Sequence, residues 1–193
     1  DRAAESFGRA AEVFSGLGGG DAQGEEALFW KGLSEFRLDR FTRAENTFLT
    51  LTDRFPSGRR VPESLYRAGV CASQVDRHGE AIGYYEGALR ALEAGTGAMG
   101  EGEYLDNLHQ EILYQKGLSH LRQGERDRAA RTYESLSREF PGATLAAEAY
   151  FKLAEADFRN RDYDGAADGF LEVKKRFPGS PPAATALYWA GLS

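Results

Sequence analysis

The sequence predicts an all-α protein built from repeated pairs of antiparallel helices. The first observation is composition: among 193 residues, Ala occurs 28 times and Leu 20 times, whereas Val and Ile together occur 7 times. Buried sheets need β-branched side chains on their pleated faces, while Ala, Leu, Glu and Arg are good helix formers. The second observation is an internal repeat with a period of 37 residues. Both observations argue against an all-β or α/β fold.

The repeat is clearest when the chain is aligned on a column of small residues. This small column consists of Gly32, Gly69, Gly117, Ala154 and Gly191. The successive intervals are 37, 48, 37 and 37 residues, so one unit carries an insertion of 11 residues. Two more columns keep this register, one of Ala (Ala44, Ala81, Ala129, Ala166) and one aromatic (Phe48, Tyr85, Tyr133, Phe170). Such register along the chain indicates stacked structural units.

Each unit is predicted to hold two helices, A and B. In the first full unit, helix A begins near Glu25 and helix B ends at Arg54. The stop is physical, because a residue that precedes proline is pushed out of the α region. The Phe-Pro pair that causes it stands at Phe55–Pro56 and recurs at Phe140–Pro141 and Phe177–Pro178. We therefore expect helix B to end at these pairs.

The alignment divides the whole chain into one solenoid. We expect a lone helix B of a partial repeat at 1–17, repeat 1 at 25–58, repeat 2 at 62–94, an inserted loop at 95–104, repeat 3 at 106–142, repeat 4 at 147–179 and the start of repeat 5 at 183–193. Natural solenoids finish with polar capping elements, and neither end of this sequence resembles one. We therefore expect four full repeats with partial repeats at both ends, as a piece of a longer protein.

Bulk properties exclude several classes of partner. The net charge is −6 and the longest basic run is Lys174–Lys175–Arg176, whereas nucleic-acid binding needs a basic stripe. No apolar run approaches the ~20 residues of a membrane span. The single cysteine, Cys71, permits neither an internal disulfide nor a thiolate metal cluster. We expect protein partners, no nucleic acid and no direct membrane span, and the oligomeric state stays open.

One glycine-rich motif invites a cofactor interpretation. Gly95, Gly97 and Gly100 form a literal Gly-x-Gly-x-x-Gly. A dinucleotide site needs this motif between a strand and a helix, so that backbone amides meet the pyrophosphate. Here the motif follows helix B of repeat 2 and belongs to the insertion. We expect a flexible loop and no cofactor.

The histidines and the cysteine do not form a recognisable catalytic or metal site. His109 and His120 lie on one predicted helix, about 16 Å apart, too far to share a metal ion. Cys71 stands in an apolar helical context, although a pair with His78 stays open. We expect no catalytic residue, no metal and no enzymatic activity. An enzyme or metal carrier that uses Cys71, His109 or His120 is the competing hypothesis.

The A helices carry the candidate binding residues. An aromatic residue stands three positions before the small column in all five units, and a Glu stands three positions earlier in four of them. With one further groove position, the candidates are Glu26, Phe29, Leu33, Glu63, Tyr66, Glu111, Tyr114, Glu148, Phe151 and Tyr188. They would line the inner face of the solenoid with an aromatic ladder and an acidic edge. Two interpretations stay open: packing between adjacent A helices, or direct contact with a ligand.

Two tryptophans interrupt a column that is otherwise polar. The position two residues before the small column holds Arg67, Gln115 and Lys152 in three units, but Trp30 and Trp189 in the other two. An exposed Trp is unusual. Each either packs against a neighbouring end element, which for Trp30 would be the helix at 1–17, or marks a contact surface.

Three short motifs carry a resemblance to a known family. They are Glu-Ala-Leu-Phe-Trp-Lys-Gly within 25–32, Glu-Ser-Leu-Tyr-Arg-Ala-Gly at 63–69 and Thr-Ala-Leu-Tyr-Trp-Ala-Gly at 185–191. They resemble the tetratricopeptide repeat. The resemblance implies a right-handed α-solenoid, the TPR superhelix, which binds a peptide or helix of a partner in its concave groove.

The Phe-Pro-Gly joints extend the resemblance to bacterial cell-envelope proteins of this family. The segments that begin at Glu139 and Arg176 are similar to repeats of the periplasmic protein associated with Tol-Pal, and to the lipoprotein of the outer-membrane β-barrel assembly machine. This implies a periplasmic or outer-membrane-associated adaptor in envelope assembly or division. An architectural or self-association segment of a larger envelope protein is the alternative function, and a cytoplasmic location stays open.

Overall fold

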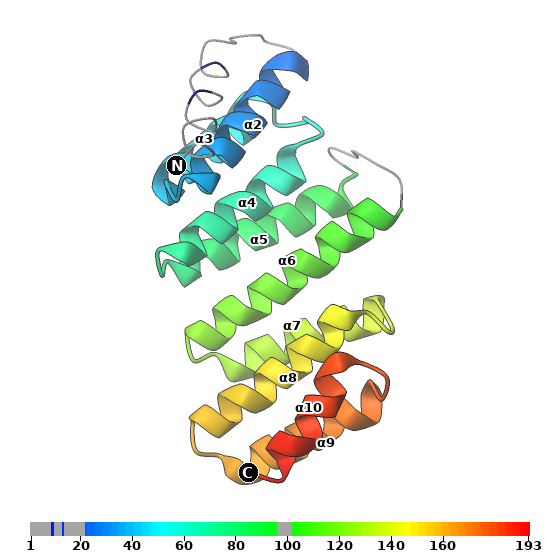
Figure 1. Ribbon diagram of the computed structural model, residues 1–193. Helices are drawn as coiled ribbons and strands as arrows, with labels where there is room; N and C mark the ends of the chain where they lie inside the picture. Colours follow the sequence, from blue (N-terminus) through cyan, green and yellow to red (C-terminus); the bar gives the residue numbers. More distant parts are fainter. Residues whose placement is uncertain (1–8, 10–12, 14–21, 96–101) are drawn as a thin grey trace. The chain divides into compact units, whose positions relative to one another are not determined.

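The described part of the chain is entirely helical. The computed structural model describes residues 9, 13, 22–95 and 102–193, and over this part it contains nine α-helices and no strand (Figure 1). The helices are α2 (Ala22–Arg37), α3 (Phe41–Arg54), α4 (Val61–Gln74), α5 (His78–Glu93), α6 (Glu103–Arg122), α7 (Arg126–Glu139), α8 (Thr144–Arg159), α9 (Tyr163–Arg176) and α10 (Pro181–Ala190). The predicted all-α class is confirmed. The helix predicted at 1–17 lies outside the described residues, apart from Arg9 and Val13.

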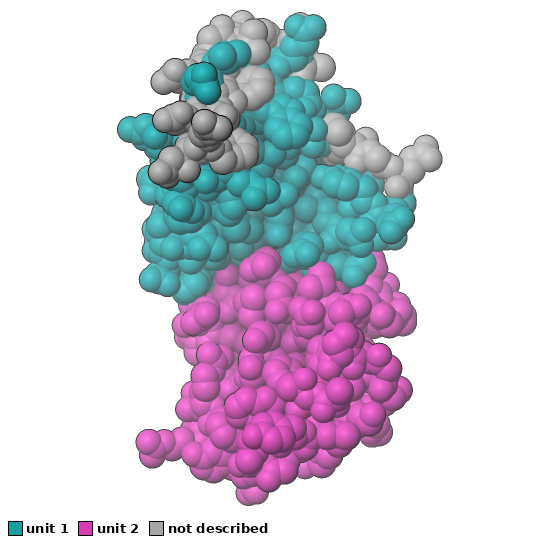
Figure 2. Space-filling view, in the orientation of Figure 1, with its two compact units in different colours: residues 1–112 teal, residues 113–193 magenta. Residues whose placement is uncertain are grey.

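The chain divides into two compact units, residues 1–112 and 113–193, with the boundary inside α6 (Figure 2). In the first unit, α2 packs on α3, α3 on α4 and α4 on α5. In the second, α7 packs on α8, α8 on α9 and α9 on α10. Within each unit, these helices therefore pack against their neighbours in sequence, as the elements of repeat arrays do.

Glycine in the small column permits the close approach of each helix pair. A Cβ atom added to Gly32 would lie 2.6 Å from the Phe48 ring, and one added to Gly69 would lie 2.5 Å from the Tyr85 ring. Gly117 stands in the same relation to a Tyr ring on α7, at Tyr133. The small column of helix A and the aromatic column of helix B are thus complementary surfaces within one repeat.

In the fourth repeat, the glycine that permits close approach lies on helix B instead of helix A. Its small column holds Ala154, and a Cβ atom added to Gly169 on α9 would lie 2.9 Å from the Ala154 Cβ. The aromatic residue Phe170 follows directly and is fully buried. The Ala154 methyl group fits here because the facing residue, Gly169, has no side chain.

The turn between helices A and B has the same backbone conformation in every full repeat. The residue at one equivalent position of each turn has a positive φ: Asp39 (55°), Asp76 (59°), Gly124 (76°) and Arg161 (65°). Gly adopts this left-handed region without cost and Asp tolerates it, whereas Arg does so rarely. The turn is therefore fixed by position in the repeat more than by residue type.

Two predicted boundaries shift in the structure. The inserted loop was expected at 95–104, but α6 already begins at Glu103, after Gly102 in the left-handed region. Glu103 and Asp106 in its first turn favour this start, because acidic side chains stabilise a helix N-terminus. Helix α2 likewise begins at Ala22, before the expected start at Glu25. Of the glycine motif in the insertion, Gly97 and Gly100 lie outside the described residues.

Candidate functional site

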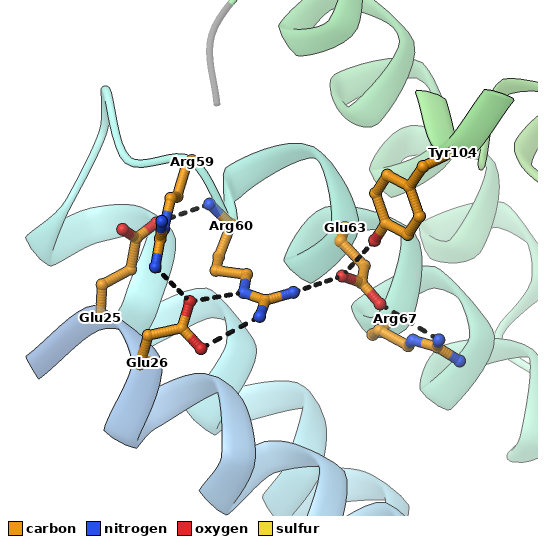
Figure 3. Close-up of polar contacts among 7 residues, drawn as sticks. All are labelled: Glu25, Glu26, Arg59, Arg60, Glu63, Arg67 and Tyr104. Atoms are coloured by element: carbon orange, nitrogen blue, oxygen red, sulfur yellow. Dashed lines mark hydrogen bonds and ion pairs between the residues drawn. The ribbon is translucent and has the colours of Figure 1, made fainter. Parts of the chain in front are cut away.

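In the first unit, the predicted groove position at Phe29 is already filled by an arginine of the next repeat. The Arg60 guanidinium lies 4.2 Å from the Phe29 ring centroid. Its Nε and Nη2 donate to the two carboxylate oxygens of Glu26, at 2.9 and 3.0 Å, and Arg59 donates to the same group at 3.1 Å (Figure 3). Phe29 is only 2% exposed. Phe29 is therefore buried within the first unit, with the Arg60 guanidinium over its ring.

The charged network continues along α4. Arg60 Nη1 donates to Glu63 at 3.1 Å, Arg67 donates to its other oxygen at 3.2 Å, and the Tyr104 hydroxyl of α6 donates at 2.6 Å (Figure 3). The backbone N–H of Arg60 donates to Glu25 at 2.6 Å. The predicted acidic edge is thus neutralised at Glu26 and Glu63, because arginines from the same face hold both carboxylates.

The electrostatics of this network favour the charged forms of Glu26 and Arg60 and the neutral form of Tyr104. Burial works against ionisation of Glu26, but hydrogen bonds and charge from Arg60 and Arg59 outweigh it and lower the pKa of the carboxyl. Burial likewise opposes the charge of Arg60, but Glu26 and Glu63 raise the pKa of its guanidinium. Burial and the Glu63 carboxylate raise the pKa of Tyr104, so its hydroxyl remains a hydrogen-bond donor.

Tyr66 is also a packing residue. Its ring is 7% exposed and lies 6.2 Å from the Tyr85 ring, in a core cluster that includes Leu108 and Ile112. Its hydroxyl donates to Glu111 at 3.4 Å. Burial and the Glu111 charge raise the pKa of Tyr66 to about 12. Most of the Tyr66 ring is therefore buried within the first unit.

The second unit presents the corresponding surface in an open form. Phe151 packs against Phe170 with ring centroids 5.1 Å apart and planes at 57°, much as Phe29 packs against Phe48 at 6.0 Å and 58°. Beside Phe151, a surface pocket of about 330 Å³ lies between α8 and α10. It is lined by Glu148, Phe151, Lys152, Pro181, Pro182 and Thr185. Within the described chain, the Glu148 side chain has neither a hydrogen bond nor an ion pair.

The remaining groove candidates differ in exposure. Leu33 is partly buried against the core of the first unit. Tyr114 is half-buried and stacks on Tyr133, with ring centroids 6.1 Å apart. Tyr188 is 66% exposed and meets only the edge of Trp189 among the rings that the structure describes. The aromatic column is thus buried on α2 and α4, half-buried on α6 and α8, and exposed on α10.

The two tryptophans have different surroundings. Trp30 is 48% exposed, with its ring edge-on to Phe29 at 6.1 Å, and the helix predicted to cover it lies outside the described residues. Trp189 is half-buried between Phe158 at 5.4 Å and Phe170 at 6.1 Å. The Trp189 ring therefore packs on α8 and α9 of the same unit.

The cysteine and histidine candidates are dispersed. Cys71 is fully buried, and burial together with the nearby Glu45 carboxylate raises the pKa of its thiol to about 12. His120 is buried, with Nδ1 at 2.7 Å from the Glu125 carboxylate, while His109 lies half-buried on the same helix. Among residues 22–95 and 102–193, no three His, Cys, Asp or Glu side chains gather where they could hold a metal ion. Nor does any helix in those ranges have the length and hydropathy to cross a bilayer.

Sequence reasoning missed the residues that cover the groove. Arg60 and Tyr104 contact the predicted Glu positions but belong to other columns of the repeat. The signal in the sequence is the residue at the start of each helix A, where Arg60 of one repeat corresponds to Pro182 of another.

Comparison with known families identifies the repeat. The tetratricopeptide repeat family matches residues 1–59, 31–96 and 114–181. The chain belongs to the tetratricopeptide repeat family. TPR arrays are scaffolds for protein–protein interaction and are typically non-catalytic.

Individual TPR relatives share the fold at low identity. The outer membrane protein assembly factor BamD of Haemophilus influenzae is 33% identical over 84 residues, which cover 42% of this chain and about a third (31%) of BamD. Among solved structures, YrrB, described as a TPR protein with an unusual peptide-binding site, has a TM-score of 0.59 at 20% identity, over 98% of this chain and 82% of its own. The TPR-like repeats of a putative kinesin light chain from Podospora anserina have a TM-score of 0.66 at 11% identity, over 89% and 84%. A thermophilic TPR protein of Thermus thermophilus has a TM-score of 0.51 at 21% identity, over 98% and 89%.

Proposed function

We propose that this TPR chain is a non-catalytic interaction module that binds a peptide or helix of a partner protein on the A-helix face of its second unit. The observation that carries the proposal is the pocket beside Phe151, where an aromatic ring and the unpaired Glu148 carboxylate meet solvent. Aromatic rings beside a charged group are typical of protein recognition sites. The exposed ring of Tyr188 extends this face along α10.

The first unit has a different role in this proposal. Phe29 and Tyr66 are buried, and the carboxylates of Glu26 and Glu63 are held by arginines. These side chains have few groups left to offer a partner. In this proposal the first unit therefore contributes structure, and the binding face lies on the second unit.

The relatives support a bacterial cell-envelope setting. BamD is an outer membrane protein assembly factor, and its match to this chain fits the envelope-type Phe-Pro-Gly joints. On this basis the proposed partner is a protein of envelope assembly or division, and the proposed location is the periplasm or the inner side of the outer membrane.

The test is a cross-linked pull-down from an envelope extract of the source organism. The bait proteins are the wild type, Phe151→Ala and Tyr163→Ala, a matched loss of an aromatic ring that is 45% exposed outside the pocket. A partner recovered by the wild type and Tyr163→Ala but lost with Phe151→Ala supports the proposal. Equal recovery by all three would overturn it, provided that thermal unfolding shows Phe151→Ala to be folded at the assay temperature.

A second candidate function is self-association. Four apolar side chains of the second unit are about half exposed or more: Leu171 (51%), Leu187 (49%), Tyr188 (66%) and Leu192 (53%). Exposed apolar side chains of this size favour an interface between proteins where they form one patch. Sedimentation equilibrium across a concentration series tests this candidate, since a protein that stays monomeric throughout would rule it out. If the wild type does associate, Leu187→Glu should shift it towards monomer.

A further inference from the structure

We infer that the pocket between α8 and α10 binds an arginine side chain of the partner, with the guanidinium over the Phe151 ring and paired with the Glu148 carboxylate. This inference rests on the proposed function, because it names the chemistry of the partner at the same site. It is drawn from a comparison between the two units of this chain.

The first unit contains the same site in an occupied form. Glu26, Phe29 and Arg60 precede Glu148, Phe151 and Pro182 by the same number of residues. The Arg60 guanidinium lies 4.2 Å from the Phe29 ring centroid and donates to both oxygens of Glu26, at 2.9 and 3.0 Å. The chain itself therefore shows which side chain a Glu and an aromatic ring in this frame accept.

The second unit keeps the frame but lacks the arginine. The aromatic pairs Phe29–Phe48 and Phe151–Phe170 have planes at 58° and 57°. The positions of Arg59 and Arg60 hold Pro181 and Pro182, which begin α10 and carry neither charge nor a long side chain. A pocket of about 330 Å³ takes the place of the guanidinium. This volume is at the lower end of the range of ligand sites, about 300–1,000 Å³, and suits a single side chain.

The charges around the pocket favour a cation. Glu148 has no partner in the described chain, while the nearest cation of the lining, Lys152, donates to Glu155 at 2.7 Å. The Glu148 carboxylate therefore stays uncompensated beside an aromatic ring, and Thr185 adds a hydroxyl to the lining. An aromatic face and a carboxylate attract the same kind of ligand, a cation that can contact both.

The geometry favours arginine over lysine. A guanidinium is planar, so it can stack on a ring while two of its N–H groups donate to one carboxylate. An ammonium group is a compact point charge and cannot form both contacts in this way. In repeat 2 the position of Arg60 is held by Leu108, which packs in the core with Tyr66. In repeat 1 the ring is thus covered in cis by Arg60, and in repeat 2 it is buried in one core cluster with Leu108.

The experiment is a chemical-shift titration of the full chain by NMR. The probes are N-acetyl-arginine amide, its lysine counterpart and its citrulline counterpart, which has the shape of arginine without the charge. We expect saturable shifts at Glu148, Phe151 and Thr185 with the arginine probe. The lysine probe should bind roughly tenfold more weakly and the citrulline probe weaker still. Equal shifts with all three probes would overturn the inference, as would none with arginine.

Variants test the site directly. Glu148→Gln should weaken arginine binding about tenfold or more, while Asp168→Asn, which removes the same charge from an exposed position on α9, should leave it unchanged. Pro182→Arg should fill the pocket in cis, as Arg60 does, and abolish the titration. Unchanged binding in Glu148→Gln would contradict the inference, whether or not Pro182→Arg folds.

The two proposals fail in different ways. If the arginine probe does not bind but the pull-down still depends on Phe151, the surface binds a partner of other chemistry. If the probe binds at Glu148 but the pull-down ignores Phe151, the pocket takes arginine while the partner docks elsewhere. Each pair of outcomes therefore identifies which statement is wrong.

Discussion

Glycine in the small column illustrates how single residues set the spacing between helices. Gly69 and the Tyr85 ring meet so closely that a methyl group on Gly69 would lie 2.5 Å from a ring carbon. The ring is fully buried and has no room to withdraw. The same helix pair contains Gly83, whose Cβ would meet nothing within 4 Å. Adding a methyl group at these two glycines of one repeat should therefore change the stability in opposite directions.

Gly69→Ala should lower the free energy of unfolding by about 1–3 kcal/mol, because the new methyl group overpacks the buried pair with Tyr85. Gly83→Ala should raise it by about 0.5–1 kcal/mol, because alanine is the better helix former at an exposed helical site. Urea denaturation of the two variants beside the wild type measures both changes. Equal effects of the two substitutions would contradict the packing argument.

Cys71 should be unreactive in the folded protein. Burial, reinforced by the Glu45 carboxylate, raises the pKa of its thiol to about 12, and the side chain has no exposed surface. Since the thiolate is the reactive form, a thiol reagent at pH 8 should label the native protein slowly and the urea-unfolded protein completely. Rapid labelling of native protein would revive the hypothesis of a reactive cysteine.

At the scale of elements, α2 and α4 are joined by charge as well as by apolar contact. Arg60 begins the second repeat, yet its guanidinium covers a ring and a carboxylate of the first. Similar links follow along the chain: Arg77 pairs with Glu45 of the preceding repeat, and Arg126 donates to Asp157 of the next at 2.6 and 2.8 Å. Repeats 1 and 2, and repeats 3 and 4, are thus linked by carboxylates that each receive an arginine, with Glu45 and Asp157 buried and Glu26 half-buried.

Acid should weaken the α2–α4 link. Because the folded pKa of Glu26 is lowered, the stability it contributes is fully present above its unfolded pKa and is lost as pH falls through the folded value, below about pH 4.5. At pH 7, Glu26→Gln should reduce the free energy of unfolding by about 1 kcal/mol, as for a partly exposed charged pair.

The pH dependence is measured by urea denaturation at a series of pH values between neutral and acid. The wild-type and Glu26→Gln curves should converge as pH falls below 4.5. A constant difference in the free energy of unfolding at all pH values would mean that Glu26→Gln destabilises the protein for a reason other than the lost charge. Asp168→Asn, at an exposed site, supplies the control for a change in net charge.

The elements were largely predictable from the sequence, and the surface was not. Helical periodicity and the Phe-Pro pairs locate helix ends such as Arg54 and Arg176, because these signals are local. The same periodicity puts Phe29 and Phe151 on equivalent faces but says nothing about what covers them. What covers each ring depends on the side chain at the start of the next helix A, which is Arg60 for Phe29 and Pro182 for Phe151. Only the packing of one repeat on the next brings that side chain beside the ring.

At the scale of the whole molecule, the chain behaves as two compact units. In a repeat array each element contacts only its neighbours, so stability is approximately a sum of local terms. A defect in one unit should then loosen that unit before the other.

Hydrogen exchange of Gly69→Ala tests this expectation. Amide protons of α4 and α5 should exchange faster than in the wild type, while those of α8 and α9 should change little, because local opening follows local stability. Mass spectrometry of proteolytic fragments from both proteins gives the comparison. Equal acceleration in the two units would indicate a single cooperative transition for the whole chain.

The correspondence between Arg60 and Pro182 has an evolutionary consequence. Duplication of a repeat copies its glutamate and its aromatic ring together, within the same frame. Whether the new copy becomes internal structure or a receptor for another protein then depends on the first turn of the repeat that follows it. An arginine there covers the ring and the carboxylate within the chain, whereas a proline leaves both open, so one position separates an internal contact from a surface open to a partner.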